Sequence, residues 1–408
     1  MLTPEYLYRI TEGAEDIASQ LHKNILDKII TRMMARIGQG EDYLLTATDK
    51  WQIEVLQDAG YLLEDIQQEL SDKTKRQVKE IKEAMEEAGV TAMQWDDNIY
   101  QSAGLSPVPL LQSPALMRIM QRNYEATAGE WRNFTRTTAN EAQRLFINQM
   151  DNAYHMVVSG AVSYTEAVRD VLKEVSDTGL KVNYPSGYKM SIEAATMMIL
   201  RTGISQAAAE VSLERMKEMD WDIILVSAHL GARTGDGGMN PGNHLWWQGH
   251  FYSRTGRTKE YPLFAETTGY GTVTGLCGVN CRHSFGPGDG GKNPFSDKDI
   301  AYADNYKIEK MQQRQRTLER RVRDTKRKLQ NMQTAIDNCK DEKLKFELQQ
   351  DFDKKSYLLK KQNAAYKQYC EENNLKPYNE RLQVAKWNRE QAMKAAGAAR
   401  RYQNAKGE

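Results

Sequence analysis

Four of the six histidines in this 408-residue chain lie between positions 229 and 283, together with two of its four cysteines. These residues are His229, His244, His250, His283, Cys277 and Cys281. Neutral imidazole and thiolate suit Zn²⁺ better than they suit cations that prefer oxygen ligands. The spacing Cys277-x3-Cys281-x-His283 therefore predicts a structural zinc site that His229 or His244 completes. The alternative is two small buried cysteines in a tight glycine turn, with locally hydrogen-bonded histidines.

The same residues also permit a catalytic hypothesis. Two histidines among His229, His244 and His283 could share proton transfer in the cleavage of a phosphodiester, with Arg233 or Arg282 holding the phosphate. This chemistry requires that the side chains line one pocket open to solvent. A cysteine nucleophile activated by a histidine is a further alternative, and it meets fewer of the requirements.

Short strands and turns are expected to position these residues. Residues 222–227 read DIILVS, which is typical of a short buried strand, and two further strands are expected at residues 250–254 and 282–285. Glycines dominate the segments between them, so residues 221–290 predict a small α+β module. Its adjacent residues Trp246 and Trp247 are expected to fill the core, and exposure as a base-stacking platform is the alternative.

The rest of the chain predicts helices. Apolar residues recur every three or four positions over residues 4–37, with Thr3 as N-cap and Pro4 at the first helical position. Further helices are expected at residues 46–52 and 62–87, with Gly89 as a break, and at 191–219. Ser163 and Glu166 form a capping-box pattern. Residues 183–189 predict a turn-rich loop.

The last hundred residues predict a helical hairpin or coiled-coil arm. A heptad-like seam runs over residues 308–336, a second helix can fold back on it, and Pro377 is expected to start a final helix. The predicted fold class is mainly α with a small α+β module. Four regions are expected: residues 1–113 and 114–220 are helical, 221–290 form the central module, and 300–408 form the basic arm.

The charge of the chain is unevenly distributed. From residue 301 onward there are 26 Lys and Arg against 15 Asp and Glu, although the whole chain carries a net charge of only +1. A basic helix of this kind suits phosphate contacts, and long exposed helices rich in lysine are the alternative explanation. The candidate DNA-binding residues are Arg314, Arg316, Arg320, Arg321, Arg323, Lys326, Arg327 and Lys328.

Composition argues against other classes of protein. No run of eighteen apolar residues occurs, so a membrane span is not expected. The first twenty residues lack a basic stretch followed by an apolar one, which predicts no secretory signal and maturation in a cytoplasm. Four cysteines at irregular spacing do not predict a disulfide framework.

Several long motifs resemble the phage minor capsid protein 2 family, whose members are related to Mu-type head morphogenesis proteins. The motifs are SAHLGAR (227–233), HLWWQGHFY (244–252), FAETTGYGTVTGLCGVNCRHSF (264–285), WQIEVLQDAG (51–60), RTGISQAAAEV (201–211) and QRQRTLERRVRDTKRKL (313–329). They are spread over most of the chain. The resemblance implies a structural, non-enzymatic head component of a tailed phage or prophage.

The resemblance also implies where the protein acts and what it contacts. It places the protein at the portal vertex of the virion, and in the host cytoplasm during assembly, with a role in head assembly, DNA packaging or DNA ejection. The implied partners are the portal protein and other head proteins. Genomic DNA bound through the basic arm and self-association are further expectations. The alternatives are a virion-delivered nuclease or toxin-like effector and a protein that chiefly binds DNA without sequence preference.

Overall fold

The structure is a computed structural model that describes residues 1–46, 50–183, 187–295 and 302–407. The chain forms two units, each assembled from three separate segments. Unit 1 comprises Met1–Glu15, Lys75–Arg132 and Ala194–Gln313, and unit 2 comprises Asp16–Thr74, Asn133–Glu193 and Arg314–Glu408. The two units group segments that are far apart in the chain, so they do not correspond to consecutive regions. The four consecutive regions expected from the sequence stay a prediction.

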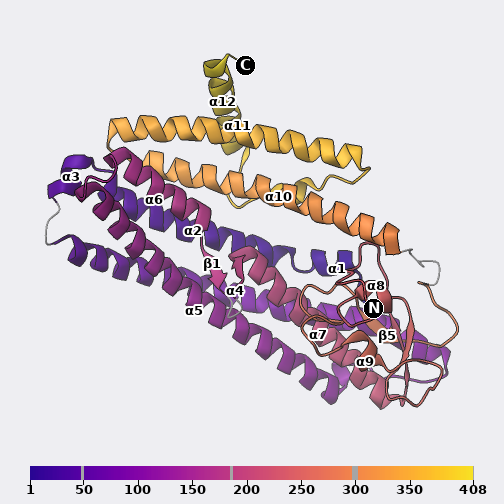
Figure 1. Ribbon diagram of the computed structural model, residues 1–408. Coiled ribbons are helices and arrows are strands. Elements are labelled where there is room, and N and C mark those ends of the chain that lie inside the picture. The colour runs from indigo at the N-terminus through magenta and orange to yellow at the C-terminus, as the bar shows by residue number, and fades with distance from the viewer. Residues whose placement is uncertain (47–49, 184–186, 296–301, 408) are drawn as a thin grey trace. The chain divides into compact units, whose positions relative to one another are not determined.

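Helices account for most of the described chain (Figure 1). They are α1 (Pro4–Arg9), α2 (Glu12–Ile37), α3 (Glu41–Thr46), α4 (Trp51–Ser102), α5 (Pro114–Val158), α6 (Tyr164–Thr178), α7 (Ile192–Glu218), α8 (His244–Trp247), α9 (Phe264–Thr268), α10 (Tyr302–Asp337), α11 (Glu342–Glu372) and α12 (Arg389–Lys406), with short 3₁₀ helices η1 (Leu110–Gln112) and η3 (Asn379–Leu382). Among the described residues, no helix is both long and apolar enough to cross a membrane. The predicted fold class, mainly α with a small β-containing module, is confirmed.

Side-chain caps fix several helix starts at the predicted places. The Thr3 hydroxyl accepts the Tyr6 N–H at the start of α1, and Pro4 is its first residue. Ser163 and Glu166 form the expected capping box of α6. The single helix expected over residues 4–37 is wrong, because α1 ends at Arg9 and α2 starts at Glu12. The Thr11 hydroxyl donates to main-chain carbonyls one turn earlier at this break.

The expected break at Gly89 is also wrong. Helix α4 runs without interruption from Trp51 to Ser102 and contains the whole helix predicted at residues 62–87. The helix predicted at residues 46–52 falls partly on residues 47–49, which lie outside the described residues. A Cβ atom at Gly89 would lie 3.2 Å from the Met120 side chain and 3.3 Å from Leu110. Met120 and Leu110 therefore pack closely against α4 at Gly89. This packing outweighs the poor helix propensity of glycine.

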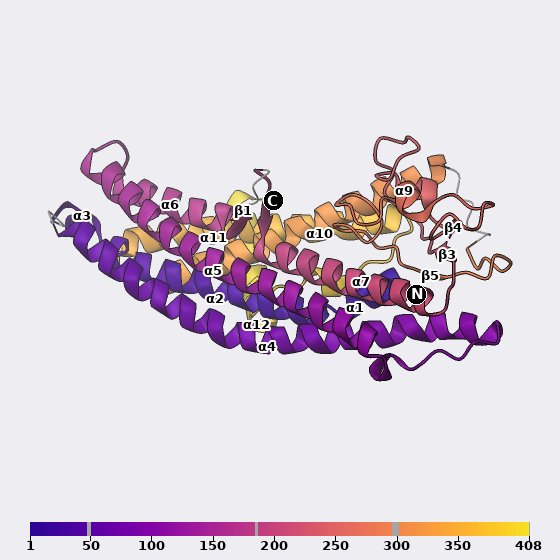
Figure 2. The same ribbon diagram turned by 90° about the horizontal axis from the view of Figure 1, so that it is seen from below.

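Two small antiparallel sheets complete the secondary structure. Strands β1 (Lys181–Asn183) and β2 (Lys189–Ser191) pair on either side of the predicted turn-rich loop, and the sequence analysis missed both. The central strand of the second sheet is β3 (Ile223–Val226), with β4 (Phe251–Ser253) and β5 (Phe285–Pro287) as its neighbours (Figure 2). The two strands predicted at 222–227 and 250–254 are confirmed. The third begins at Phe285, three residues later than predicted, because Phe285 pairs with Val226.

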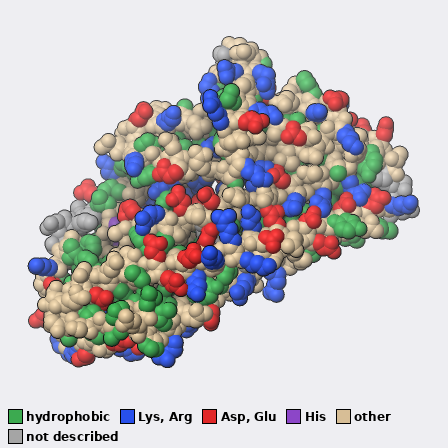
Figure 3. Space-filling model, turned by 180° about the vertical axis from the view of Figure 1, so that it is seen from behind, with side chains coloured by type: hydrophobic (Ala, Val, Ile, Leu, Met, Phe, Trp, Pro, Cys, Tyr) green, Lys and Arg blue, Asp and Glu red, His purple; other side chains and the backbone are tan. Residues whose placement is uncertain are grey.

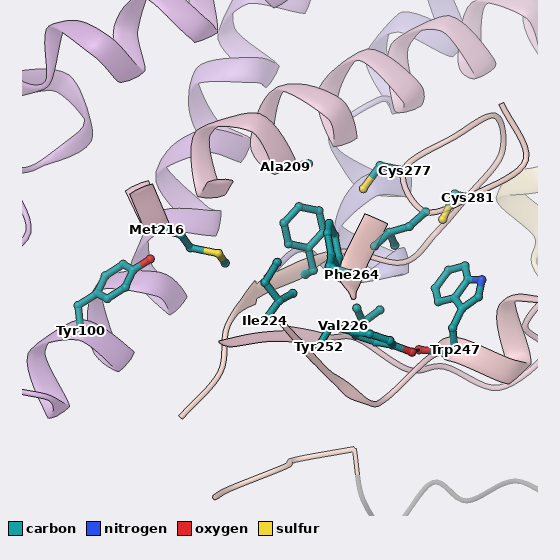
Figure 4. Packing of buried hydrophobic residues seen from close by; sticks show 12 residues of the cluster. Tyr100, Ala209, Met216, Ile224, Val226, Trp247, Tyr252, Phe264, Cys277 and Cys281 are labelled. Carbon is teal, nitrogen blue, oxygen red and sulfur yellow. Dashed lines mark hydrogen bonds between the residues drawn. The ribbon is translucent and has the colours of Figure 1, made fainter. Parts of the chain in front are cut away.

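The core of unit 1 joins this sheet to helices α4 and α7. Tyr100 and Met216 from those helices belong to the same buried cluster as Ile224, Trp247 and Phe264 (Figure 4). The Trp247 side chain is fully buried, and its indole N–H donates to the Pro241 carbonyl at 3.0 Å. The expected core role of this tryptophan is therefore confirmed.

In unit 2, α11 and the part of α10 from Arg314 onward form the expected helical hairpin. The Tyr366 hydroxyl donates to Glu319 at 3.4 Å, which joins the two helices across the hairpin. The hairpin packs within unit 2 through buried charges: the Glu193 carboxylate lies 2.9 Å from both the His22 ring nitrogen and the Arg327 guanidinium. The final helix expected from Pro377 is wrong, since α12 starts at Arg389, where the Asn388 side chain caps it.

Candidate metal centre

Three buried side chains of unit 1 bring ligand atoms together. They are His244, which opens α8, and Cys281 and His283, which precede β5. The Cys281 Sγ lies 3.8 Å from Nδ1 of His244 and 3.7 Å from Nδ1 of His283. Each residue offers one ligand atom, and these atoms all lie within 4.8 Å of one another. We refer to His244, Cys281 and His283 as the His-Cys-His group.

Local turns position the group. The Asn243 side chain caps α8 by accepting the Trp246 N–H, which fixes the backbone beside His244. On the other side, Gly278 stands where a Cβ atom would lie 2.4 Å from the Val273 carbonyl oxygen, so only glycine fits this close approach. The turn that follows delivers the Cys281 thiol into the core.

Hydrogen bonds fix the tautomer of both histidines. His244 Nε2 lies 2.9 Å from the Thr274 carbonyl oxygen, which can only accept, so this nitrogen carries the proton. His283 Nε2 lies 2.8 Å from Gln248 Oε1, which also accepts the His229 main-chain N–H at 3.1 Å. Both Nε2 atoms are therefore donors. In neutral rings, each Nδ1 then presents a lone pair toward the Cys281 sulfur.

Burial favours the neutral forms of all three side chains. Burial lowers the pKa of His244 to about 4, and it lowers the pKa of His283 well below the usual value. It also raises the pKa of the Cys281 thiol. At neutral pH the group therefore consists of two neutral imidazoles and a neutral thiol.

The other predicted residues lie beside this group. The Cys277 thiol donates to the His283 carbonyl oxygen at 3.8 Å and is not part of the group. The His229 ring stacks on the His283 ring with centroids 4.3 Å apart. The Arg233 guanidinium donates to the Val279 carbonyl at 2.9 Å. The structure thus brings Cys281 and His283 together with His244, and it places Cys277 and His229 beside this group without making them members of it.

This geometry suits a structural centre better than an acid–base site. His244 and His283 are 2% and 1% exposed, so a phosphodiester would have no access to them in this arrangement. Sequence reasoning missed Gln248 and Thr274, the partners that orient the two histidines. The Thr274 acceptor is a main-chain carbonyl, which no residue-type pattern could have indicated.

The predicted DNA-binding residues differ in exposure along α10. Arg314, Arg320 and Arg321 are exposed, and Arg316 and Arg323 are half-buried. Lys326 is buried and donates to the Leu382 carbonyl at 2.7 Å, and burial lowers its pKa to about 8.

The two remaining basic residues pair with acidic groups of unit 2. Arg327 bonds to Glu193 and Lys328 to Asp177. On the face shown in Figure 3, Lys and Arg side chains lie among Asp and Glu side chains. The basic sequence of α10 therefore serves packing as well as surface charge.

The comparisons with known proteins agree with the sequence motifs. The family described as Phage minor capsid protein 2 matches residues 2–371. The chain belongs to the phage minor capsid protein 2 family. A protein named "Structural protein" from Lactococcus phage LL-H is 26% identical over 196 residues, which are 48% of this chain and 52% of that protein. The chain thus spans about half the length of this curated relative.

No solved structure matches this minor capsid protein. Family membership places this chain among the phage minor capsid proteins, as the motifs indicated. All three residues of the His-Cys-His group lie within the matched range 2–371.

Proposed function

We propose that this minor capsid protein is a head component that acts at the portal vertex of a tailed phage, in head assembly and in DNA packaging or ejection. The observation that carries this proposal is the family match over residues 2–371, which includes nearly all of unit 1 and the part of unit 2 up to residue 371. The partners we propose are the portal protein and other head proteins.

Exposed apolar side chains at the start of α4 offer a contact surface for such a partner. Ile53 and Leu56 are 59% and 58% exposed, and their spacing of three residues makes them neighbours on the helix. Exposed apolar residues that lie together on a helix are suited to protein–protein contact. We propose that this surface, Ile53 and Leu56, contacts another head protein.

Incorporation into heads tests this function. In a phage that carries this gene, purified heads are expected to contain the protein, and immunogold labelling is expected at a single vertex. The double variant Ile53→Glu/Leu56→Glu should enter heads at less than a tenth of the native level, because it places charge in an apolar contact. Heads that lack the native protein would refute the proposal.

A matched control separates contact from charge. Gln52 and Gln57 are exposed on the same turns of α4, so Gln52→Glu/Gln57→Glu adds the same charge beside the apolar pair. This control should enter heads normally. Equal losses for both double variants would show that charge near α4, and not the apolar surface, decides incorporation.

Contact with DNA is the second function that we propose, and the exposed part of α10 supports it. Arg314 and Arg321 are seven residues apart and so share a helix face, and Arg320 is also exposed. Three phosphate contacts would give a slope of roughly −2.7 in log affinity against log salt concentration. A gel-shift titration of the triple alanine variant should lose that slope. An unchanged slope would exclude these arginines as the DNA contacts.

A further inference from the structure

We infer that the His-Cys-His group is a zinc site held by Nδ1 of His244, Sγ of Cys281 and Nδ1 of His283. This inference is independent of the role at the portal vertex. Its basis is that the two imidazoles and the thiol direct their coordinating atoms at one small volume within the core of unit 1.

The tautomers are those that metal ligation requires. Histidines that bind a metal through one ring nitrogen usually donate the other N–H to a carbonyl or carboxylate, which orients the ring. His244 does this with the Thr274 carbonyl at 2.9 Å, and His283 does it with Gln248 Oε1 at 2.8 Å. Both Nδ1 lone pairs are thus left for a ligand on the side of Cys281.

Hydrogen bonding alone does not satisfy the group. The Cys281 thiol carries one proton, and it faces Nδ1 of both histidines at 3.7–3.8 Å. One S–H group can serve one of these acceptors, so the other buried Nδ1 keeps a lone pair without a donor from the group. Unsatisfied buried acceptors cost about 1–3 kcal/mol and usually mark a function, an ion or a water.

The separations fit a tetrahedral zinc ion. With Zn–S of about 2.3 Å and Zn–N of about 2.0–2.1 Å, a tetrahedron places sulfur and nitrogen about 3.6 Å apart. The two observed Sγ–Nδ1 distances are 3.8 and 3.7 Å. These two edges match the tetrahedron to about 0.2 Å. The two histidine ligand atoms lie within 4.8 Å of each other, and a tetrahedron places two nitrogens about 3.3 Å apart, so zinc binding would draw the two imidazoles toward each other. Ligands of the N₂S type suit zinc and exclude magnesium and calcium, which take oxygen ligands.

The surroundings shield this three-ligand site from solvent. The Trp247 ring lies 4.5 Å from the His244 ring and 4.9 Å from the His283 ring, so an aromatic wall shields the site. The ion would tie α8 to the segment before β5, which are more than thirty residues apart in the chain. Cys277 points its thiol at the His283 carbonyl instead, and we assign it a packing role.

Metal content of the purified full-length chain tests the inference. After removal of metal with EDTA and addition of excess Zn²⁺ followed by gel filtration, the native protein is expected to retain one zinc per chain by elemental analysis. Cys281→Ser and His244→Asn should each retain less than a tenth of that amount. With Co²⁺ in place of zinc, the native protein should show a thiolate-to-cobalt charge-transfer band that Cys281→Ser lacks.

Two cysteine variants serve as controls. Cys370→Ser removes a buried thiol from unit 2, and Cys277→Ser removes the neighbouring thiol, so both should keep one zinc per chain. Circular dichroism identifies variants that fail to fold. If Cys281→Ser does not fold, X-ray absorption on the native zinc protein decides through its expected shell of one sulfur and two imidazoles. A native protein without zinc, or a Cys277→Ser variant that loses zinc as Cys281→Ser does, would overturn the assignment.

Discussion

Replacing Asp222 by asparagine should destabilise the central module more than most substitutions of a single polar group. Asp222 lies directly before β3, and its carboxylate accepts five hydrogen bonds, from the hydroxyl groups of Ser253, Thr255 and Thr258 and from the main-chain N–H groups of Thr255 and Thr258. These bonds tie the start of β3 to the end of β4 and to the turn after it. Asparagine has the same shape but only one acceptor oxygen.

The magnitude follows from the bonds that cannot be remade. If the amide oxygen of the new asparagine faces Thr255, its NH₂ group faces the Thr258 N–H, and two donors then oppose each other. The two hydroxyl groups on that side can rotate to accept, but the main-chain N–H cannot. An unpaired buried donor costs about 1–3 kcal/mol, and the loss of charge weakens the remaining bonds, so we expect a total near 3 kcal/mol.

Hydrogen exchange followed by mass spectrometry measures this loss locally. A loss of about 3 kcal/mol should speed amide exchange in peptides that contain β3 and β4 by roughly 100-fold. Asp220→Asn is the matched control, because Asp220 is an exposed carboxylate whose pair with Arg257 lies at the surface. If Asp222→Asn changes exchange less than tenfold, the carboxylate network does not hold the module together.

The pH dependence of the same network has a defined sign. Burial raises the pKa of Asp222, but the hydroxyl and N–H donors outweigh it and hold that pKa well below the usual value. The contribution of ionised Asp222 to folding stability is therefore fully present above the unfolded-state pKa of about 3.9, and it is lost as the pH falls toward the folded-state pKa. The difference in stability between native protein and Asp222→Asn should shrink steadily from about pH 5 downward.

Three further predictions concern other parts of the chain. Glu193→Gln should destabilise unit 2 by about 3 kcal/mol in urea denaturation, since it removes the buried carboxylate between His22 and Arg327 and leaves Arg327 paired only with the exposed Asp324. A loss below about 1 kcal/mol would contradict this. Gly275→Ala should lower the melting temperature, because the new Cβ would lie 2.1 Å from the Gly269 carbonyl oxygen and the turn could not close. Gly60→Ala is the matched control: its Cβ meets nothing within 4 Å, and it should stabilise the folded protein by about 0.5–1 kcal/mol because alanine favours the helix α4. Gln248→Leu should weaken zinc affinity about 10–100-fold in competition titrations without abolishing binding, and an unchanged affinity would show that it does not orient His283.

Local chemistry made part of this structure predictable. Thr3, Pro4 and the capping box of Ser163 and Glu166 act within one helical turn, so their sequence pattern was sufficient. Gly89 misled the prediction because its neighbours Met120 and Leu110 lie more than twenty residues away, and its role depends on their approach. Intrinsic propensity cannot report that kind of contact.

The candidate site shows the same limit. The Cys281-x-His283 spacing placed two residues of the group correctly, because both lie on one short segment. The choice between His229 and His244 was open, since it depends on how α8 folds back against that segment. The separation of Cys277 from the group likewise depends on the turn around Gly278, where backbone atoms leave no room for a side chain.

The interleaving of chain segments has a consequence for synthesis. Unit 1 contains Met1–Glu15 but also needs Ala194–Gln313, and the Ser284 hydroxyl donates to the Leu2 carbonyl at 2.7 Å. A ribosome adding about 5–20 residues per second would present the first segment roughly 15–60 seconds before its partner emerges. The first segment of unit 1 therefore stays without its packing partner for most of the time that the chain takes to be synthesised.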